Sequence, residues 1–152
     1  MQNIKIKQVE VTSHSAVNLM MQLDEELKER YPNGPIFGID VEEFQKAKDF
    51  FAVAFIDEKA VGCGAFRKLT EQDVEIKRMF VLADYRRQGI SRRILNFLEE
   101  AAKQRGFSRV CLETGIQQPE SISLYLSCGY KEIPLFGRYK GNMLSKCFEK
   151  KL

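Results

Sequence analysis

Hydrophobic residues follow two repeats along the chain. Apolar and polar residues alternate over 4–11, which is typical of a strand with one buried face. Apolar residues of 91–105 instead recur on one helical face, and Gly106 follows as a C-cap. The segment 31–35 contains two prolines and a glycine and predicts a loop. The whole pattern predicts strands over 4–11, 50–56, 60–69, 74–81, 109–113, 130–134 and 144–150. It also predicts one helix that ends near residue 30 and three further helices over 41–48, 91–105 and 119–127.

The order of these elements indicates the fold class. A helix joins the strand over 74–81 to the strand over 109–113, so these two strands should lie parallel in one sheet. The remaining strands are joined by turns or long returns that suit antiparallel pairing. We therefore expect an α/β fold with a mixed, mostly antiparallel sheet flanked by helices. The 152 residues contain no linker and no repeat, which predicts one domain over 1–152.

Composition and charge exclude several classes. With 44% hydrophobic and 30% charged residues, the chain is typical of a globular protein. A net charge of +3 is too balanced to predict a nucleic-acid or membrane partner, and no apolar run approaches the roughly 18 residues of a membrane span. The four cysteines form no C-x-x-C pair, so we expect neither a metal site nor disulfides. Free cysteines are typical of the cytoplasm, where we expect the protein to be.

The sequence DYRRQGISRRIL at 84–95 sets four arginines around a glycine at the expected start of a helix. The helix dipole disfavours cations there by roughly 0.3–1 kcal/mol each, so a bound anion would explain them better than helix stability does. A strand, a tight glycine turn and a helix form an anion site, because the first helical N–H groups point outward. The arginines therefore predict a phosphate group, although solvated surface arginines are the alternative. No P-loop and no G-x-G-x-x-G motif is present.

Two motifs connect this turn to a known family. Arg86-x-x-Gly89-x-Ser91 resembles the Q/R-x-x-G-x-G/A signature of the GNAT superfamily of acyl-CoA N-acyltransferases, with Ser91 departing from the usual Gly or Ala. Leu124-Tyr125-x-x-x-Gly129-Tyr130 resembles the family's L-Y-x-x-x-G-F/Y segment. The order of elements also matches, most clearly over 50–133. Other short pieces are similar to small stand-alone bacterial GNAT enzymes: Arg30-Tyr-Pro32, Glu113-Thr-Gly115, Gln118-Pro-Glu120 and Phe136-Gly-x-Tyr139.

The resemblance implies acetyl-CoA as the cofactor. Its pantetheine arm would run between two splayed parallel strands, at Met79–Val81 and Leu112–Thr114, and bond backbone groups of Met79 and Val81. Arg86, Arg92 or Lys103 would meet the outer phosphate, and the sequence leaves this choice open. The pyrophosphate would lie on the backbone N–H groups of Arg87, Gln88, Gly89, Ile90 and Ser91.

The resemblance also implies an N-acetyltransferase that acts by direct attack of a primary amine in a ternary complex. Glu75 is the candidate base, on one strand face with Lys77 and Met79 unless a bulge intervenes; the alternative is that it pairs with Lys77 or Arg67. Glu113 and ordered water are the other candidate bases.

In the family pattern Tyr125 points at the cofactor sulfur, which makes it the candidate acid, although a core aromatic is the alternative. The resemblance also implies a backbone N–H at a strand bulge, near Phe80 or Val81, that would stabilise the oxyanion.

The acceptor site is expected beside the first helices and the last loop, lined by Tyr31, Phe37, Phe136, Arg138 and Tyr139. Arg138, Arg67 or Arg78 would bind a carboxylate, which favours an amino acid or peptide, while a polyamine or aminoglycoside would prefer a more acidic pocket. By analogy with the fold, residues 144–148 are expected to pair across a homodimer. Two other classes remain open: a non-catalytic acyl-CoA sensing module, and a nucleic-acid-binding protein that uses the four arginines.

Overall fold

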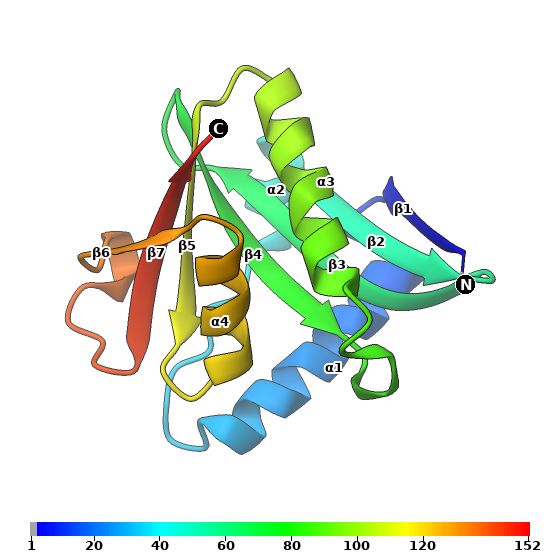
Figure 1. Ribbon diagram of the computed structural model, residues 1–152, viewed down its shortest axis with the longest axis horizontal. Coiled ribbons are helices and arrows are strands. Elements are labelled where there is room, and N and C mark those ends of the chain that lie inside the picture. The colour runs from blue at the N-terminus through cyan, green and yellow to red at the C-terminus, as the bar shows by residue number, and fades with distance from the viewer. Residues whose placement is uncertain (1–2) are drawn as a thin grey trace.

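The computed structural model describes residues 3–152 as one seven-stranded sheet between two layers of helices (Figure 1). The strands are β1 (Ile4–Gln8), β2 (Phe50–Ile56), β3 (Lys59–Lys68), β4 (Asp73–Val81), β5 (Arg109–Gly115), β6 (Lys131–Ile133) and β7 (Ser145–Lys151). The helices are α1 (His14–Arg30), α2 (Val41–Lys46), α3 (Ile90–Gln104) and α4 (Pro119–Ser127), with short 3₁₀ turns at Ala83–Tyr85 and Gly137–Tyr139.

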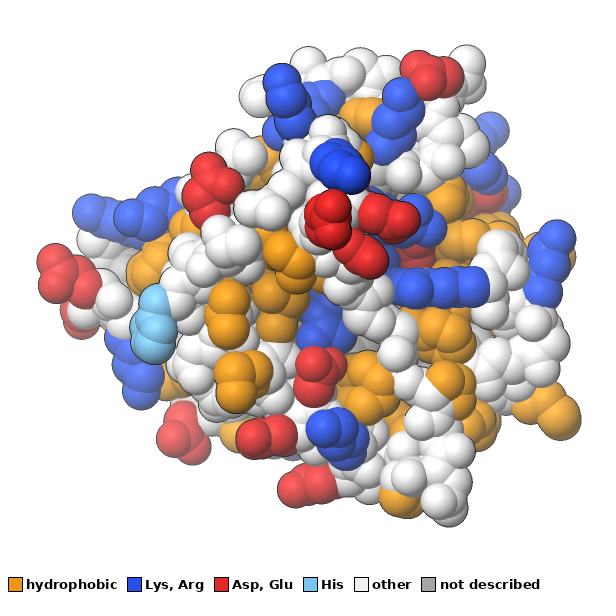
Figure 2. Space-filling model, turned by 180° about the vertical axis from the view of Figure 1, so that it is seen from behind, with side chains coloured by type: hydrophobic (Ala, Val, Ile, Leu, Met, Phe, Trp, Pro, Cys, Tyr) orange, Lys and Arg blue, Asp and Glu red, His pale blue; other side chains and the backbone are white. Residues whose placement is uncertain are grey.

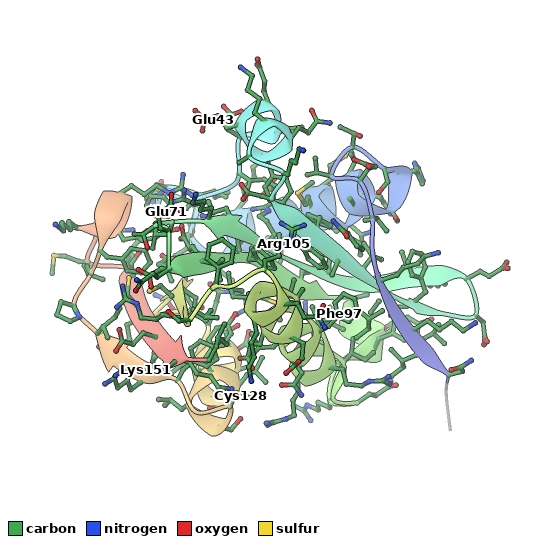
Figure 3. The ribbon with its side chains drawn as sticks, turned by 90° about the horizontal axis from the view of Figure 1, so that it is seen from above. Glu43, Glu71, Phe97, Arg105, Cys128 and Lys151 are labelled. Carbon is green, nitrogen blue, oxygen red and sulfur yellow. The ribbon has the colours of Figure 1, made fainter. Side chains whose placement is uncertain are left out.

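The sheet has the order β1-β2-β3-β4-β5-β7-β6 and is antiparallel except for the β4/β5 pair. Helices α3 and α4 cover one face, while α1 and α2 cover the other, as the view from above shows (Figure 3). This arrangement confirms the expected α/β class and the parallel pair. None of the helices within 3–152 is long and apolar enough to cross a membrane.

The parallel strands separate halfway along their length. β4 and β5 pair only from Asp73/Arg109 to Ile76/Leu112, whereas β5 continues to pair with β7 as far as Gly115. The second halves of β4 and β5 therefore diverge. The expected splay is confirmed, and it opens the sheet where α4 begins.

A bulge interrupts β4 at Arg78 and Met79. Cys63 pairs with Phe80 and Ala65 pairs with Lys77, so Arg78 and Met79 together face the single residue Gly64. The bulged residue Arg78 has a φ of 60°. A Cβ on Gly64 would lie 2.6 Å from the Met79 sulfur, so a larger residue opposite the bulge would force the neighbouring side chains to shift. The bulge is the exception under which Met79 would leave the face of Glu75 and Lys77, and the extra residue turns Met79 towards Ile94 and Leu98 of α3.

Two other expectations need correction. The 41–48 helix ends at Lys46, since Lys48 has a positive φ of 54°. β7 lies between β5 and β6 and is bonded on both sides over Cys147–Glu149, so this stretch has no free edge for a partner strand. At this end of the sheet the edge strand is β6, so Cys147 and Phe148 cannot pair with a strand of a partner, while a homodimer formed in another way stays a prediction.

Candidate active site

Two connected cavities occupy the region where β4 and β5 diverge. The inner pocket lies between α1, the bulge of β4 and the start of α4, and has a volume of about 80 Å³. The outer groove, of about 510 Å³, runs along the turn before α3. Both cavities are lined by Leu23, Met79, Gln118, Ser121 and Tyr125, so they form one cleft with these side chains at the junction.

The glycine turn forms one wall of the outer groove. Gly89 is the N-cap of α3 with a φ of 78°, and a Cβ added to it would meet no atom within 4 Å. Ile90 is buried and anchors the first turn of the helix in the core. The free N–H groups of this first turn and the open space at Gly89 fit a phosphate group.

Most of the arginines at this turn have protein partners. Arg86 donates to the Val81 carbonyl at 2.8 Å and to Glu26 at 2.7 Å, and Arg92 donates to Ser127 at 2.8 Å. Arg93 donates to the Ile4 carbonyl at 3.2 Å. The Val81 carbonyl is thus already engaged. Within 3–152 the Arg87 side chain makes no hydrogen bond or ion pair; it is exposed beside the groove with a φ of 65°.

Tyr125 lies at the junction of the two cavities. Its side chain is buried, and its ring contacts the edge of Tyr130 at a centroid distance of 5.7 Å. Burial raises the pKa of the Tyr125 phenol, so the hydroxyl keeps its proton at neutral pH.

A hydrogen-bonded trio that the sequence did not reveal supports this position. The Tyr130 hydroxyl donates to Glu99 at 2.7 Å, and Lys150 donates to the same carboxylate at 3.0 Å. The trio joins α3, the end of α4 and β7. It thereby fixes the ring against which Tyr125 packs.

Glu75 is fully buried and its carboxylate is already paired. Arg67 donates to one oxygen at 2.8 Å, the Tyr139 hydroxyl donates to the other, and the Lys77 nitrogen lies at 3.9 Å. Glu75 does not line the inner pocket. The pairing with Arg67 and Lys77, which the sequence offered as the alternative to a base, is present.

Lys77 and Glu113 are two of the three charged residues in the wall of the inner pocket beside this network, and Arg78 is the third. Lys77 donates to the Tyr139 hydroxyl at 2.9 Å, and burial lowers the pKa of Lys77 to about 8 despite the opposing effect of Glu75. Glu113 accepts a hydrogen bond from Ser145, and burial raises the pKa of its carboxyl. Lys77 has one signal in the sequence, namely a lysine in an otherwise buried strand.

The residues expected around the acceptor lie together only in part. The Tyr139 ring contacts the edges of Phe37 at 4.9 Å and Phe136 at 5.4 Å, and only Phe37 and Tyr139 of the five expected residues line the inner pocket. Arg138 is exposed, and its guanidinium carbon lies 5.3 Å from the centre of the Phe37 ring. The guanidinium donates to the Gly38 carbonyl at 2.8 Å.

Tyr31 lies in a neighbouring small cavity. Its hydroxyl accepts from the Gln117 N–H at 2.8 Å, beside Gly115, whose missing Cβ leaves the space for it.

The charges on the face that carries α1 and α2 are mixed. Figure 2 shows acidic and basic side chains interspersed there, without one broad basic area. This distribution does not favour nucleic-acid binding on that face.

The splayed strands, the glycine turn and the connected cleft define an acyltransferase fold. Residues 16–130 match the family model described as the Acetyltransferase (GNAT) family, and the chain belongs to this family. It is 35% identical over 153 residues to an IAA acetyltransferase of Azospirillum brasilense, with full coverage of both chains.

Solved structures agree with this assignment. A structure described as an acyl-CoA N-acyltransferase of Klebsiella pneumoniae has a TM-score of 0.83 and 28% identity, covering 98% of this chain and 97% of its own. A GNAT acetyltransferase of Elizabethkingia anophelis with acetyl-CoA bound shares the fold over the whole of both chains, with a TM-score of 0.75 and 16% identity. GNAT enzymes use acetyl-CoA, and this chain is an acyltransferase.

Proposed function

We propose that the protein transfers an acetyl group from acetyl-CoA to the primary amine of a small molecule by direct attack in a ternary complex. The observation that carries this proposal is the continuous cleft, in which a groove with a phosphate-type turn meets a small inner pocket at Tyr125. The turn before α3 would hold the cofactor through the N–H groups of residues 87–91, and exposed Arg87 would add charge. Acetyl-CoA supplies the activated acetyl group when bound.

Glu113 is the proposed base. It lines the inner pocket, and its raised pKa brings it closer to neutral pH, where a general base works best. Glu75 is enclosed and bonded to Arg67 and Tyr139, which suits a fixed charge that holds Lys77 and Tyr139 in place. Glu113 would take the proton that the acceptor amine loses.

Tyr125 is the proposed acid, and the β4 bulge is the proposed site that stabilises negative charge. The phenol stays protonated at the junction of the two cavities, where it can donate to a leaving sulfur. The bulge frees backbone groups near Met79 from the sheet ladder, and the Cys63 thiol donates to the Arg78 carbonyl at 3.2 Å across it. The relevant N–H is therefore expected at Met79 or Phe80.

The first test is calorimetric titration with acetyl-CoA and with CoA, comparing the wild type with Gly89→Glu. Gly106→Glu is a matched control, because Gly106 follows the other end of the same helix with a φ of 92° and equally open surroundings. Micromolar binding lost only in Gly89→Glu supports the proposal, and turnover is then sought with a panel of primary amines. Wild-type protein that binds no CoA would overturn the proposal, and binding without any turnover would favour a sensing module.

Two further properties belong to this proposal. The four free cysteines support a cytoplasmic site of action. One sheet runs through residues 3–152, which supports a single acyltransferase domain over 1–152.

A further inference from the structure

Arg78 is a buried cation with unused donors on the wall of the inner pocket. Its side chain is 4% exposed, and its Nη2 donates to the Met20 carbonyl at 3.1 Å and to Asp24 at 2.7 Å. Among the buried side-chain nitrogen and oxygen atoms of residues 3–152, only the Nε of Arg78 has no hydrogen-bond partner. Nη1 makes no hydrogen bond within these residues either, so the guanidinium is only half used.

Two costs coincide at this residue. A buried, unpaired donor is destabilising, and native structures rarely keep one without a reason. The backbone of Arg78 also has a φ of 60°, a strained conformation for a residue with a side chain. Nε has almost no accessible surface, so a ligand would accept from Nη1, which has no partner within 3–152 and is not enclosed. The strained backbone and this unbonded donor on a pocket residue point to a missing ligand that would accept from Arg78.

The charge of the pocket indicates the kind of ligand. Its charged lining residues are Lys77, Arg78 and Glu113, that is, two cations and one carboxylate. Asp24 pairs with Arg78 at 2.7 Å and Glu75 lies 3.9 Å from Lys77, so the lining has little net charge, and the complement that it offers a ligand is the unbonded donors of Arg78. An amine must be neutral to attack, so an acceptor with a carboxylate would carry a negative charge that can accept from these donors. A polyamine or aminoglycoside would bring further positive charge towards Lys77 and Arg78 and is disfavoured.

Size and polarity narrow the class further. At roughly 10–15 Å³ per water position, the volume of about 80 Å³ accommodates on the order of five to eight non-hydrogen atoms. Leu23, Leu27 and Phe37 supply an apolar side of the pocket. A free amino acid with a short apolar side chain fits these limits, whereas a peptide would have to extend beyond the inner pocket.

We propose that the acceptor is a small apolar α-amino acid, whose carboxylate is bound by the guanidinium of Arg78 while its amine lies towards Tyr125. This inference rests on the proposed acetyl transfer and names its substrate class. Arg78 is then a substrate-binding residue at the β4 bulge. Arg138 and Arg67, the other candidates for a carboxylate, do not line the inner pocket.

The test compares ligands that differ only in the carboxylate. L-valine, L-valinamide and isobutylamine are titrated calorimetrically into the wild type, with and without CoA. We expect L-valine to bind at least about tenfold more tightly than both analogues, the size of effect typical of a hydrogen bond to a charged group. Equal binding of the three ligands, tighter binding of isobutylamine, or no binding of L-valine would overturn the inference.

Variants locate the effect. Arg78→Met should abolish the preference for L-valine, and Arg78→Lys, which keeps the charge, should retain part of it. Arg105→Gln is the matched control, because Arg105 is an exposed arginine outside both cavities that donates to the Lys48 carbonyl, and it should keep the full preference. Circular dichroism will show whether Arg78→Met folds. If it does not, the inference is tested by the three ligands on the wild type and on Arg78→Lys. Failure of CoA to bind would overturn the proposed acetyl transfer, while the L-valine preference is still read without CoA.

Discussion

Replacing Tyr139 by Phe removes a single oxygen from the centre of the buried network. The hydroxyl accepts from Lys77 at 2.9 Å and donates to Glu75, and the residue is 2% exposed. The ring contacts with Phe37 and Phe136 do not involve this oxygen, so Tyr139→Phe preserves the packing. The substitution therefore isolates the hydrogen bonds that hold two buried charges.

The magnitude follows from those two bonds. A hydrogen bond to a charged group contributes about 1.5–3 kcal/mol, and here both partners stay buried after the oxygen is lost. Glu75 keeps its bond to Arg67, which compensates in part, so the free energy of unfolding should fall by about 2–4 kcal/mol. For a chain of this length, at about 2–4 °C for each kcal/mol, the melting temperature should fall by roughly 4–16 °C.

The measurement is urea and thermal unfolding followed by circular dichroism. Tyr85→Phe is the control, because the Tyr85 hydroxyl makes no hydrogen bond within 3–152 and its loss should cost less than about 0.5 kcal/mol. If Tyr139→Phe also lost less than about 0.5 kcal/mol, the hydroxyl would not stabilise Lys77 and Glu75, and the assignment of Glu75 as a fixed charge would be wrong.

Three further predictions follow from the cleft. Gly64→Ala should cost about 1–3 kcal/mol in urea unfolding, because the new Cβ lies 2.6 Å from the Met79 sulfur and 2.9 Å from Ile94; a neutral result would contradict the tight fit. Tyr125→Phe should lower turnover by about 10²–10⁴-fold while calorimetric CoA binding is unchanged, and unaltered turnover would remove its role as acid. Burial raises the pKa of Glu113, so its basic form becomes populated at a higher pH than for an ordinary carboxyl group, and kcat/KM should rise with pH as this group loses its proton. If the same rise of kcat/KM remained in Glu113→Gln, it would belong to another group.

The sequence predicted most of the fold because its signals are local. The apolar, aromatic-rich run of 50–56 and the amphipathic repeat before Gly106 each arise within a few residues, and β2 and α3 lie where those patterns placed them. The phosphate-type turn was visible for the same reason. The bulge has no such local pattern, because it depends on how β4 pairs with β3; only the family resemblance implied one, near Phe80 or Val81, and Gly64, a glycine inside a strand, is its mark in the sequence.

The environment of Glu75 depends on distant parts of the chain. Its partner Tyr139 lies 64 residues further along, in a 3₁₀ turn that no hydrophobic repeat predicts. A carboxylate on a strand could therefore be recognised, while the groups that occupy its oxygens could not. The raised pKa of Glu113 likewise results from burial by the whole fold.

The concentration of charge beneath the inner pocket is itself an argument for function. Buried ion pairs often contribute little net stability, and apolar residues of similar size would serve the core at least as well. Here Glu75, Lys77 and Arg78 are all buried in one stretch of β4, and the strained backbone of Arg78 lies in the same stretch. Such features persist where the surrounding structure enforces them and where they serve binding or catalysis. Stabilising apolar replacements in this stretch should therefore raise the free energy of unfolding only at the expense of acceptor binding.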